Sequence, residues 1–150
     1  MVHALEEIHR LLRPDGSLID IHPSLEAPLV EIHQDGKTVF AEPVPEHAYQ
    51  DKQQAEKALI DVVQRGLFMV QRAGVFDFRV YASSIVELRS FLEEANAFED
   101  SPPDDEAEAW QAELAAQVVE AMQAAGEGAE VAFYERVRIT RLRPFAGCKQ

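Results

Sequence analysis

The chain has 150 residues, of which 47% are hydrophobic, and this length suits one compact domain that can bury a core. Its net charge of −13 argues against a nucleic-acid partner, because such a field repels a phosphate backbone. A single cysteine, Cys148, excludes an internal disulfide and fits a reducing compartment. Because no secretory leader and no bilayer-spanning apolar run is present, we expect a cytoplasmic protein with no membrane contact.

The first 23 residues predict a helix, a tight turn and a short strand. Apolar residues recur at three- and four-residue steps from Ala4 to Leu12, which is typical of a helix with one buried face. The turn Pro14–Gly16 ends this helix. Ser17–Ile21 follows as a strand that stops at Pro23.

This helix–turn–strand resembles the segment of class I S-adenosylmethionine-dependent methyltransferases, of the type 11 kind, that carries the pattern E-x-x-R-x-L-[KR]-P-x-G before the fifth strand. Asp15 stands where the family usually has a first glycine after the proline. The resemblance implies the C-terminal half of a Rossmann-like domain, since the family places this pattern after its cofactor-binding half. The matching residues are Glu7, Arg10, Leu12, Arg13, Pro14 and Gly16.

The cofactor-binding features of that family would lie before Met1. They are a glycine-rich turn after the first strand and an acidic residue at the end of the second. None of the seven glycines forms such a turn, and Gly126-Glu127-Gly128, which comes nearest, follows a helical pattern and precedes a strand. We therefore expect no cofactor for this chain alone, although the family uses S-adenosylmethionine.

Asp35-Gly36 predicts a β-hairpin with a type I′ turn over Leu29–Phe40. The expected register places Ile32 opposite Val39 and Val30 opposite Ala41 on one apolar face. By resemblance, this hairpin is an addition between the fifth strand and the next helix.

The central part of the chain predicts a long helix and a half-buried strand. An apolar stripe favours a helix over Gln50–Arg72 that contains Gly66 and ends at Gly74. Period-two alternation then indicates a strand over Phe76–Ala82, with the two phenylalanines, Val80 and Ala82 on its buried face.

The last part predicts two helices and a long strand. A capping box at Ser84–Glu87 opens a helix that ends near Asn96, and Phe98–Asp105 is expected to be a surface loop. A helix over Ala107–Ala125 follows. The strand Glu130–Arg143 is expected to turn Val131, Phe133, Val137 and Ile139 to one side.

Together these elements predict an α/β fold, α+β in isolation, as a single domain over residues 1–150. Its mixed sheet would contain the first strand, Phe76–Ala82, Glu130–Leu142 and the inserted hairpin, with flanking helices. The resemblance implies that the final strand lies antiparallel between the other two.

Three groups of side chains suggest a site, and each also has an ordinary structural interpretation. Asp20 and His22 share a strand face near His33 of the hairpin, which suits a metal or general-base cluster, but the spacing favours edge histidines. The final strand is rich in arginines, foremost Arg136 and Arg138, which would form an anion patch or neutralise acidic helices. Trp110 and Tyr134 would line an apolar pocket or belong to the core.

Two functions follow from these observations. In the first, the chain is a methyltransferase-like module that does no chemistry and binds itself or a partner. In the second, it is the C-terminal part of an active methyltransferase whose other half is missing or supplied in trans; an in-frame glycine-rich segment upstream of Met1 would favour it. We expect a homodimer, because Leu18–Ile21 would be an apolar sheet edge. The alternative is a monomer in which the hairpin folds back onto that edge.

Overall fold

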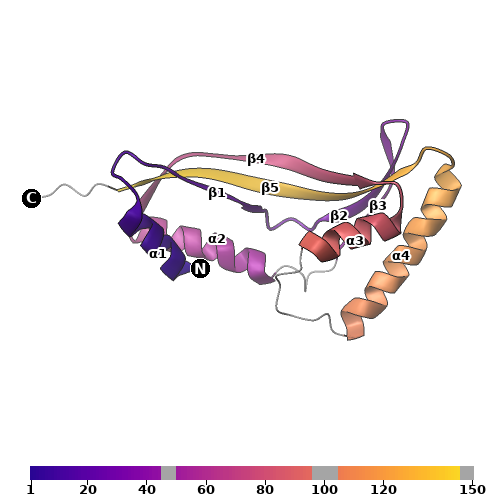
Figure 1. The fold of residues 1–150 in the computed structure, drawn as a ribbon, viewed down its shortest axis with the longest axis horizontal. Coiled ribbons are helices and arrows are strands. Elements are labelled where there is room, and N and C mark those ends of the chain that lie inside the picture. The colour runs from indigo at the N-terminus through magenta and orange to yellow at the C-terminus, as the bar shows by residue number, and fades with distance from the viewer. Residues whose placement is uncertain (45–49, 96–104, 146–150) are drawn as a thin grey trace, which may run out of the picture. The chain divides into compact units, whose positions relative to one another are not determined.

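The computed structural model describes residues 1–44, 50–95 and 105–145 and shows an α+β fold (Figure 1). Within these residues, four helices accompany an open, mostly antiparallel sheet of five strands. The elements in chain order are α1 (Val2–Leu11), β1 (Leu18–Pro23), β2 (Leu29–Gln34), β3 (Lys37–Pro43), α2 (Gln50–Gln64), β4 (Phe68–Ala82), α3 (Ile85–Ala95), α4 (Asp105–Ala125) and β5 (Glu130–Pro144).

The final strand, β5, organises the sheet. The strand order is β1-β5-β2-β3, and β4 also pairs with β5. Residues Val137–Leu142 of β5 pair antiparallel with β1, and residues 130–134 pair antiparallel with β2. The final strand thus pairs with both β1 and β4 and runs antiparallel to β1.

The chain divides into two compact units. Unit 1 comprises Met1–Ala27, Pro45–Phe78 and Glu135–Gln150, and unit 2 comprises Pro28–Val44 and Arg79–Tyr134. Each unit has an apolar core of its own. The buried core residues of unit 1 are Leu5, Ala58, Leu59, Val62, Phe68 and Leu142, and those of unit 2 are Val30, Ile32, Ala82, Leu88, Leu114, Val118 and Val131.

The prediction of a helix over Gln50–Arg72 is wrong at its C-terminal end. α2 stops at Gln64, and Gly66 ends it with a φ of 71°, a backbone angle that glycine adopts without strain. The amide of Leu67 donates to the carbonyl of Val62, which closes the last turn. Gly74 therefore lies inside β4, which begins eight residues earlier than predicted. Pairing of this segment with β5 outweighs its helical apolar spacing.

The predicted hairpin is confirmed, but the predicted pairing of Ile32 with Val39 and of Val30 with Ala41 is wrong. Next to the turn, Gln34 lies opposite Lys37 and His33 opposite Thr38. Asp35 and Gly36 have φ angles of 51° and 73°, as a type I′ turn requires. A β-bulge between Ile32 and His33 then shifts the pairing, so that Ile32 lies opposite Phe40 instead of Val39. Phe40 consequently packs on the core of unit 2, while Val39 is 55% exposed.

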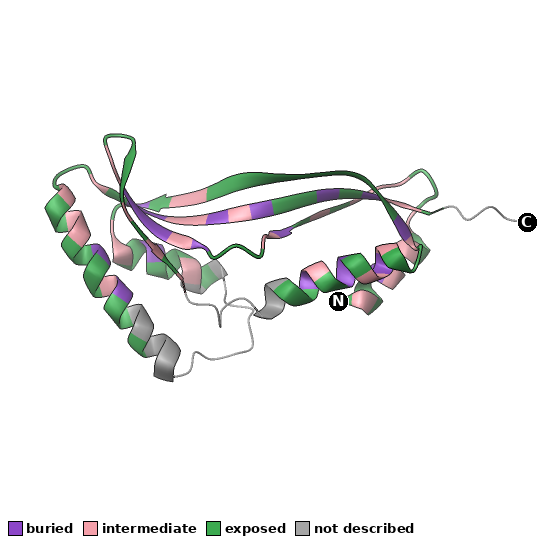
Figure 2. Ribbon diagram, turned by 180° about the vertical axis from the view of Figure 1, so that it is seen from behind, coloured by how far each residue is buried: buried purple, intermediate pink, exposed green. Residues whose placement is uncertain are grey.

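The buried face of the final strand changes along its length. Val131 and Val137 are buried, but Ile139 is 37% exposed, and further along Thr140 and Leu142 are buried instead. A similar difference occurs in β4, where Phe76 and Phe78, predicted to be buried, are exposed. Figure 2 shows that β4 is coloured as exposed along most of its length.

The helices of unit 2 agree with their sequence signals. The hydroxyl of Ser84 accepts the backbone N–H of Glu87, and the carboxylate of Glu87 accepts the backbone N–H and the hydroxyl of Ser83. α4 ends at Ala125 and is followed by Gly126, whose φ is 94°. The predicted loop Phe98–Asp105 lies outside the described residues, except for Asp105, where α4 begins.

Candidate functional site

A buried histidine of β1 lies between two carboxylates in unit 1. His22 is 7% exposed. Its Nδ1 is 2.5 Å from Oδ2 of Asp20, and its Nε2 is 2.9 Å from Oε2 of Glu56, which α2 contributes. The guanidinium of Arg138 on β5 donates to the other oxygen of Glu56. Four ionisable side chains from two strands and one helix thus form a connected network.

The contacts of this network link α2 to β1 and β5. An ionised carboxylate only accepts hydrogen bonds, so both ring nitrogens of His22 donate at once only when each carries a proton. In that state both nitrogens are occupied by carboxylates, which leaves no free nitrogen to act as a base. The network therefore ties α2 to the sheet. Sequence reasoning paired Asp20 with His22 but missed Glu56, because nothing in the sequence places that helix turn over β1.

Arginine side chains of the proposed anion patch are engaged by acidic residues. Arg138 contacts Glu56, and Nη1 of Arg136 is 3.5 Å from Oε1 of Glu26. Arg141 donates from Nε to the hydroxyl of Ser17 at 3.1 Å. The first two contacts neutralise charge within the protein.

A second polar cluster crosses the sheet in unit 2. Oε2 of Glu31 accepts from Nε2 of His33 at 2.8 Å and from Nε of Arg79 at 2.9 Å. Because Glu31 belongs to β2 and Arg79 to β4, the arginine reaches across the intervening strand β5. Residue 132 of β5, which lies opposite Glu31, is an alanine, and its small side chain leaves room for the arginine side chain. Burial alone raises the pKa of Glu31, but the hydrogen bonds from Arg79 and His33 bring that pKa below its usual value.

Tyr134 belongs to this cluster. The guanidinium of Arg79 lies 4.4 Å from the centre of the Tyr134 ring, in a cation–π contact. The predicted apolar pocket joined Tyr134 to Trp110, whose backbone lies in α4 but whose side chain is outside the described part of the structure. Neither cluster holds a metal arrangement: within residues 1–44, 50–95 and 105–145, no group of three or more His, Cys, Asp or Glu side chains is placed to bind a metal ion.

The strand β1 has a free edge within the described residues of unit 1. In the described sheet β1 pairs with β5 alone, so its other side has no strand neighbour. The hairpin pairs with β5 and not with β1, so it does not cap this edge. Ile19 and Ile21 are 51% and 59% exposed. Ile21 pairs with Ile139, so the side chains of Ile21 and Ile139 lie on one face of the sheet, and those of Asp20 and His22 lie on the other face.

Charge is distributed unequally between the two units. Unit 1 contains 11 acidic and 11 basic side chains, whereas unit 2 contains 16 acidic and three basic ones. The whole net charge of −13 therefore resides in unit 2. Two copies of unit 1 would meet without net repulsion, and two copies of unit 2 would repel one another.

Comparison of the chain with protein-family models, with curated proteins and with solved structures found no match. None of the helices in the described residues combines the length and the apolar character needed to cross a membrane.

Proposed function

We propose that these 150 residues form a cytoplasmic, methyltransferase-like module that does no chemistry by itself and associates with a second copy through the free edge of β1. The observation that carries the proposal is this edge, whose outer backbone groups have no strand partner in the described residues and lie next to the exposed side chains of Ile19 and Ile21. Antiparallel pairing of two β1 strands about a twofold axis would satisfy both copies at once.

Two further features support β1 as the point of contact. It lies wholly in unit 1, whose acidic and basic side chains balance. The other long edge, β4, runs into unit 2 at Arg79, so pairing along β4 would bring acidic units together. The resemblance around Glu7–Gly16 supports the methyltransferase-like part of the proposal, as does the position of β5 between β1 and β4.

The same free edge also supports a second candidate function. In the methyltransferase fold the strand that resembles β1 has a further strand beside it. A cofactor-binding half that supplies this strand would make the chain the C-terminal part of an active S-adenosylmethionine-dependent enzyme. Reading the coding DNA upstream of the Met1 codon tests this candidate, which predicts an in-frame strand, glycine-rich turn and helix.

Light scattering behind a sizing column tests the self-association. Wild-type protein from about 100 μM to about 1 μM spans ordinary dimer affinities. We expect an average mass that rises above 16.8 kDa with concentration. We also expect it to rise with salt, because salt screens repulsion between the acidic units. A mass near 16.8 kDa under all conditions would contradict the proposal.

A pair of matched variants locates the contact. Ile21→Lys places a charge on the β1 edge strand, where lysine opposes strand pairing. Ile60→Lys makes the same change on α2, where Ile60 is 46% exposed. We expect Ile21→Lys to remain monomeric at about 100 μM and Ile60→Lys to behave like the wild type. Equal behaviour of the two variants would show that β1 is not the interface.

A further inference from the structure

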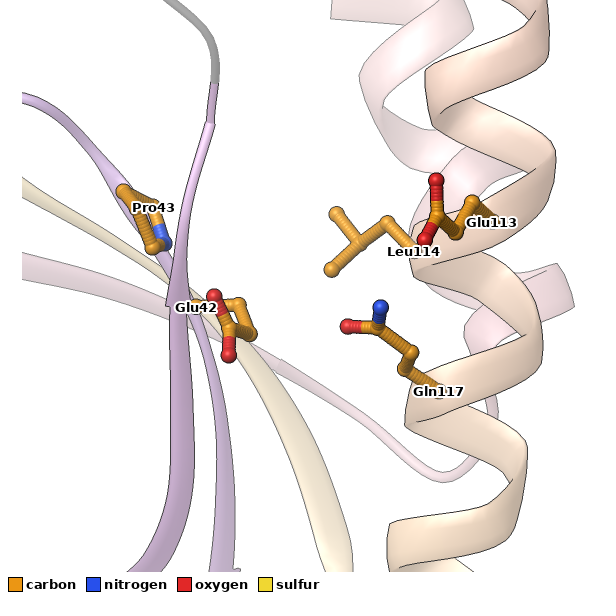
Figure 3. Close-up of a pocket in the computed structure, with 5 residues that line it drawn as sticks. All are labelled: Glu42, Pro43, Glu113, Leu114 and Gln117. Atoms are coloured by element: carbon orange, nitrogen blue, oxygen red, sulfur yellow. The ribbon is translucent and has the colours of Figure 1, made fainter.

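Unit 2 contains a groove between β3 and α4. Two adjoining depressions of about 170 and 480 Å³ share Glu42 and Gln117. Figure 3 shows the residues that line the smaller one. Residues 113, 117, 120, 121 and 124 of α4 line one side at helical spacing, so the groove follows the helix for roughly 16 Å. Phe40, Glu42 and Pro43 of β3 line the other side.

The strand that borders this groove has a free edge. β3 is the last strand of the sheet order, and β2 is its partner in the described residues. An extended segment can add to such an edge by backbone hydrogen bonds. A groove of roughly 16 Å accommodates five or six residues of strand at about 3.3 Å per residue.

The groove combines an apolar floor with acidic walls. Leu114 is buried, and Phe40 and Ala121 pack against the core of unit 2. Glu42 and Glu113 line the first depression, and Glu42 and Glu120 line the second. No lysine or arginine is among the described residues that line either depression. In the described residues no side chain donates a hydrogen bond to these three carboxylates. They belong to the unit that holds the whole net charge of the protein.

We propose that the groove binds an extended basic segment of another protein, which adds to β3 as an edge strand. Alternate side chains of an added strand point to the same face, so every second residue would lie over the groove. Lysine or arginine at these positions would meet Glu42, Glu113 and Glu120, and their aliphatic stems would cover Phe40 and Leu114. This site is independent of the β1 edge.

The test uses a fluorescein-labelled peptide of about eight residues in which lysine alternates with valine, because this spacing puts every lysine on one strand face. Its counterpart with glutamate in place of lysine is the peptide control. We expect fluorescence anisotropy to show saturable binding of the lysine peptide at roughly micromolar concentrations in low salt, and none of the glutamate peptide. Equal binding of both peptides would overturn the proposal.

Two double variants with the same charge separate the groove from the general field of unit 2. Glu42→Gln with Glu120→Gln removes two groove carboxylates, and Glu94→Gln with Glu127→Gln removes two exposed carboxylates elsewhere in unit 2. We expect the groove variant to bind the lysine peptide about tenfold more weakly and the control variant to change affinity less than about twofold. Equal weakening would show attraction by net charge alone, and the proposal would be wrong.

Amide hydrogen exchange of the wild-type protein with the lysine peptide tests the mode of binding. Addition of a strand to β3 predicts slower exchange of outward-facing amides between Thr38 and Glu42. Unchanged exchange in β3 at saturating peptide would overturn the proposed strand addition.

Discussion

Replacement of Glu56 by glutamine should destabilise unit 1, because this carboxylate holds both His22 and Arg138. The contact with His22 is the larger contribution, since the His22 side chain is only 8% exposed and a hydrogen bond to a charged group contributes about 1.5–3 kcal/mol. The Arg138 side chain is 44% exposed, so solvent screening limits its contribution to less than about 1 kcal/mol. Glutamine is uncharged and retains one acceptor oxygen, so it can replace only part of these two contacts. We therefore expect a loss of about 2 kcal/mol in the free energy of unfolding.

Urea unfolding at neutral pH measures this loss. Glu7→Gln is the matched control, because Glu7 also contacts an arginine, Arg10, but is 63% exposed. The control should lie within about 0.5 kcal/mol of the wild type. His22→Gln, alone and combined with Glu56→Gln, completes a double-mutant cycle, and the coupling energy should be about 1 kcal/mol or more. A Glu56→Gln variant as stable as the control, or a cycle without coupling, would refute the reasoning.

Three further predictions concern the turn, the second cluster and the cofactor. Gly36→Val should lower the free energy of unfolding by about 1 kcal/mol or more, because residue 36 has a positive φ that a side chain with a Cβ adopts only with strain. Urea unfolding measures this loss, and an unchanged midpoint would contradict the prediction. The lowered pKa of Glu31 stabilises the fold above the pKa of an unfolded glutamate, about 4.3, and this contribution is lost as pH falls through the folded value. The fall in stability between about pH 5 and 3 should therefore be shallower in Glu31→Gln. Isothermal titration near 100 μM should detect no binding of S-adenosylmethionine to this chain, and saturable one-to-one heat would contradict that expectation.

Local signals in the sequence predicted much of the fold. The turn at Asp35-Gly36 and the helix cap at Ser84 depend on neighbouring residues alone, and the structure contains both, although Glu87 accepts from Ser83 and not from Ser84. The end of α2 was missed because Leu67 and Val70 continue the helical spacing, although Gly66 offered a valid end signal. Gly66 and Gly74 could both end the helix, and the pairing of β4 with β5 selects Gly66. Pairing with a strand that is distant in the sequence cannot be predicted from local apolar spacing.

The candidate sites were less predictable for the same reason. Asp20 and His22 lie two residues apart, so their shared strand face follows from alternation. Glu56 and Arg79 reach their partners from other elements, and only the sheet order brings them there. The bulge beside His33 adds one residue to the register, which exchanges Val39 for Phe40 on the core face. No pattern within the hairpin marks that bulge.

Amide hydrogen exchange at two protein concentrations tests the central claim most directly, because it locates the contact between copies as well as detecting it. At about 100 μM, where the dimer is expected to form, the amides of Leu18–His22 that do not bond to β5 should exchange more slowly than at about 1 μM. The amides of β4 should exchange at the same rate at both concentrations. Concentration-dependent protection in β4, or equal exchange of β1 at both concentrations, would contradict self-association through the β1 edge.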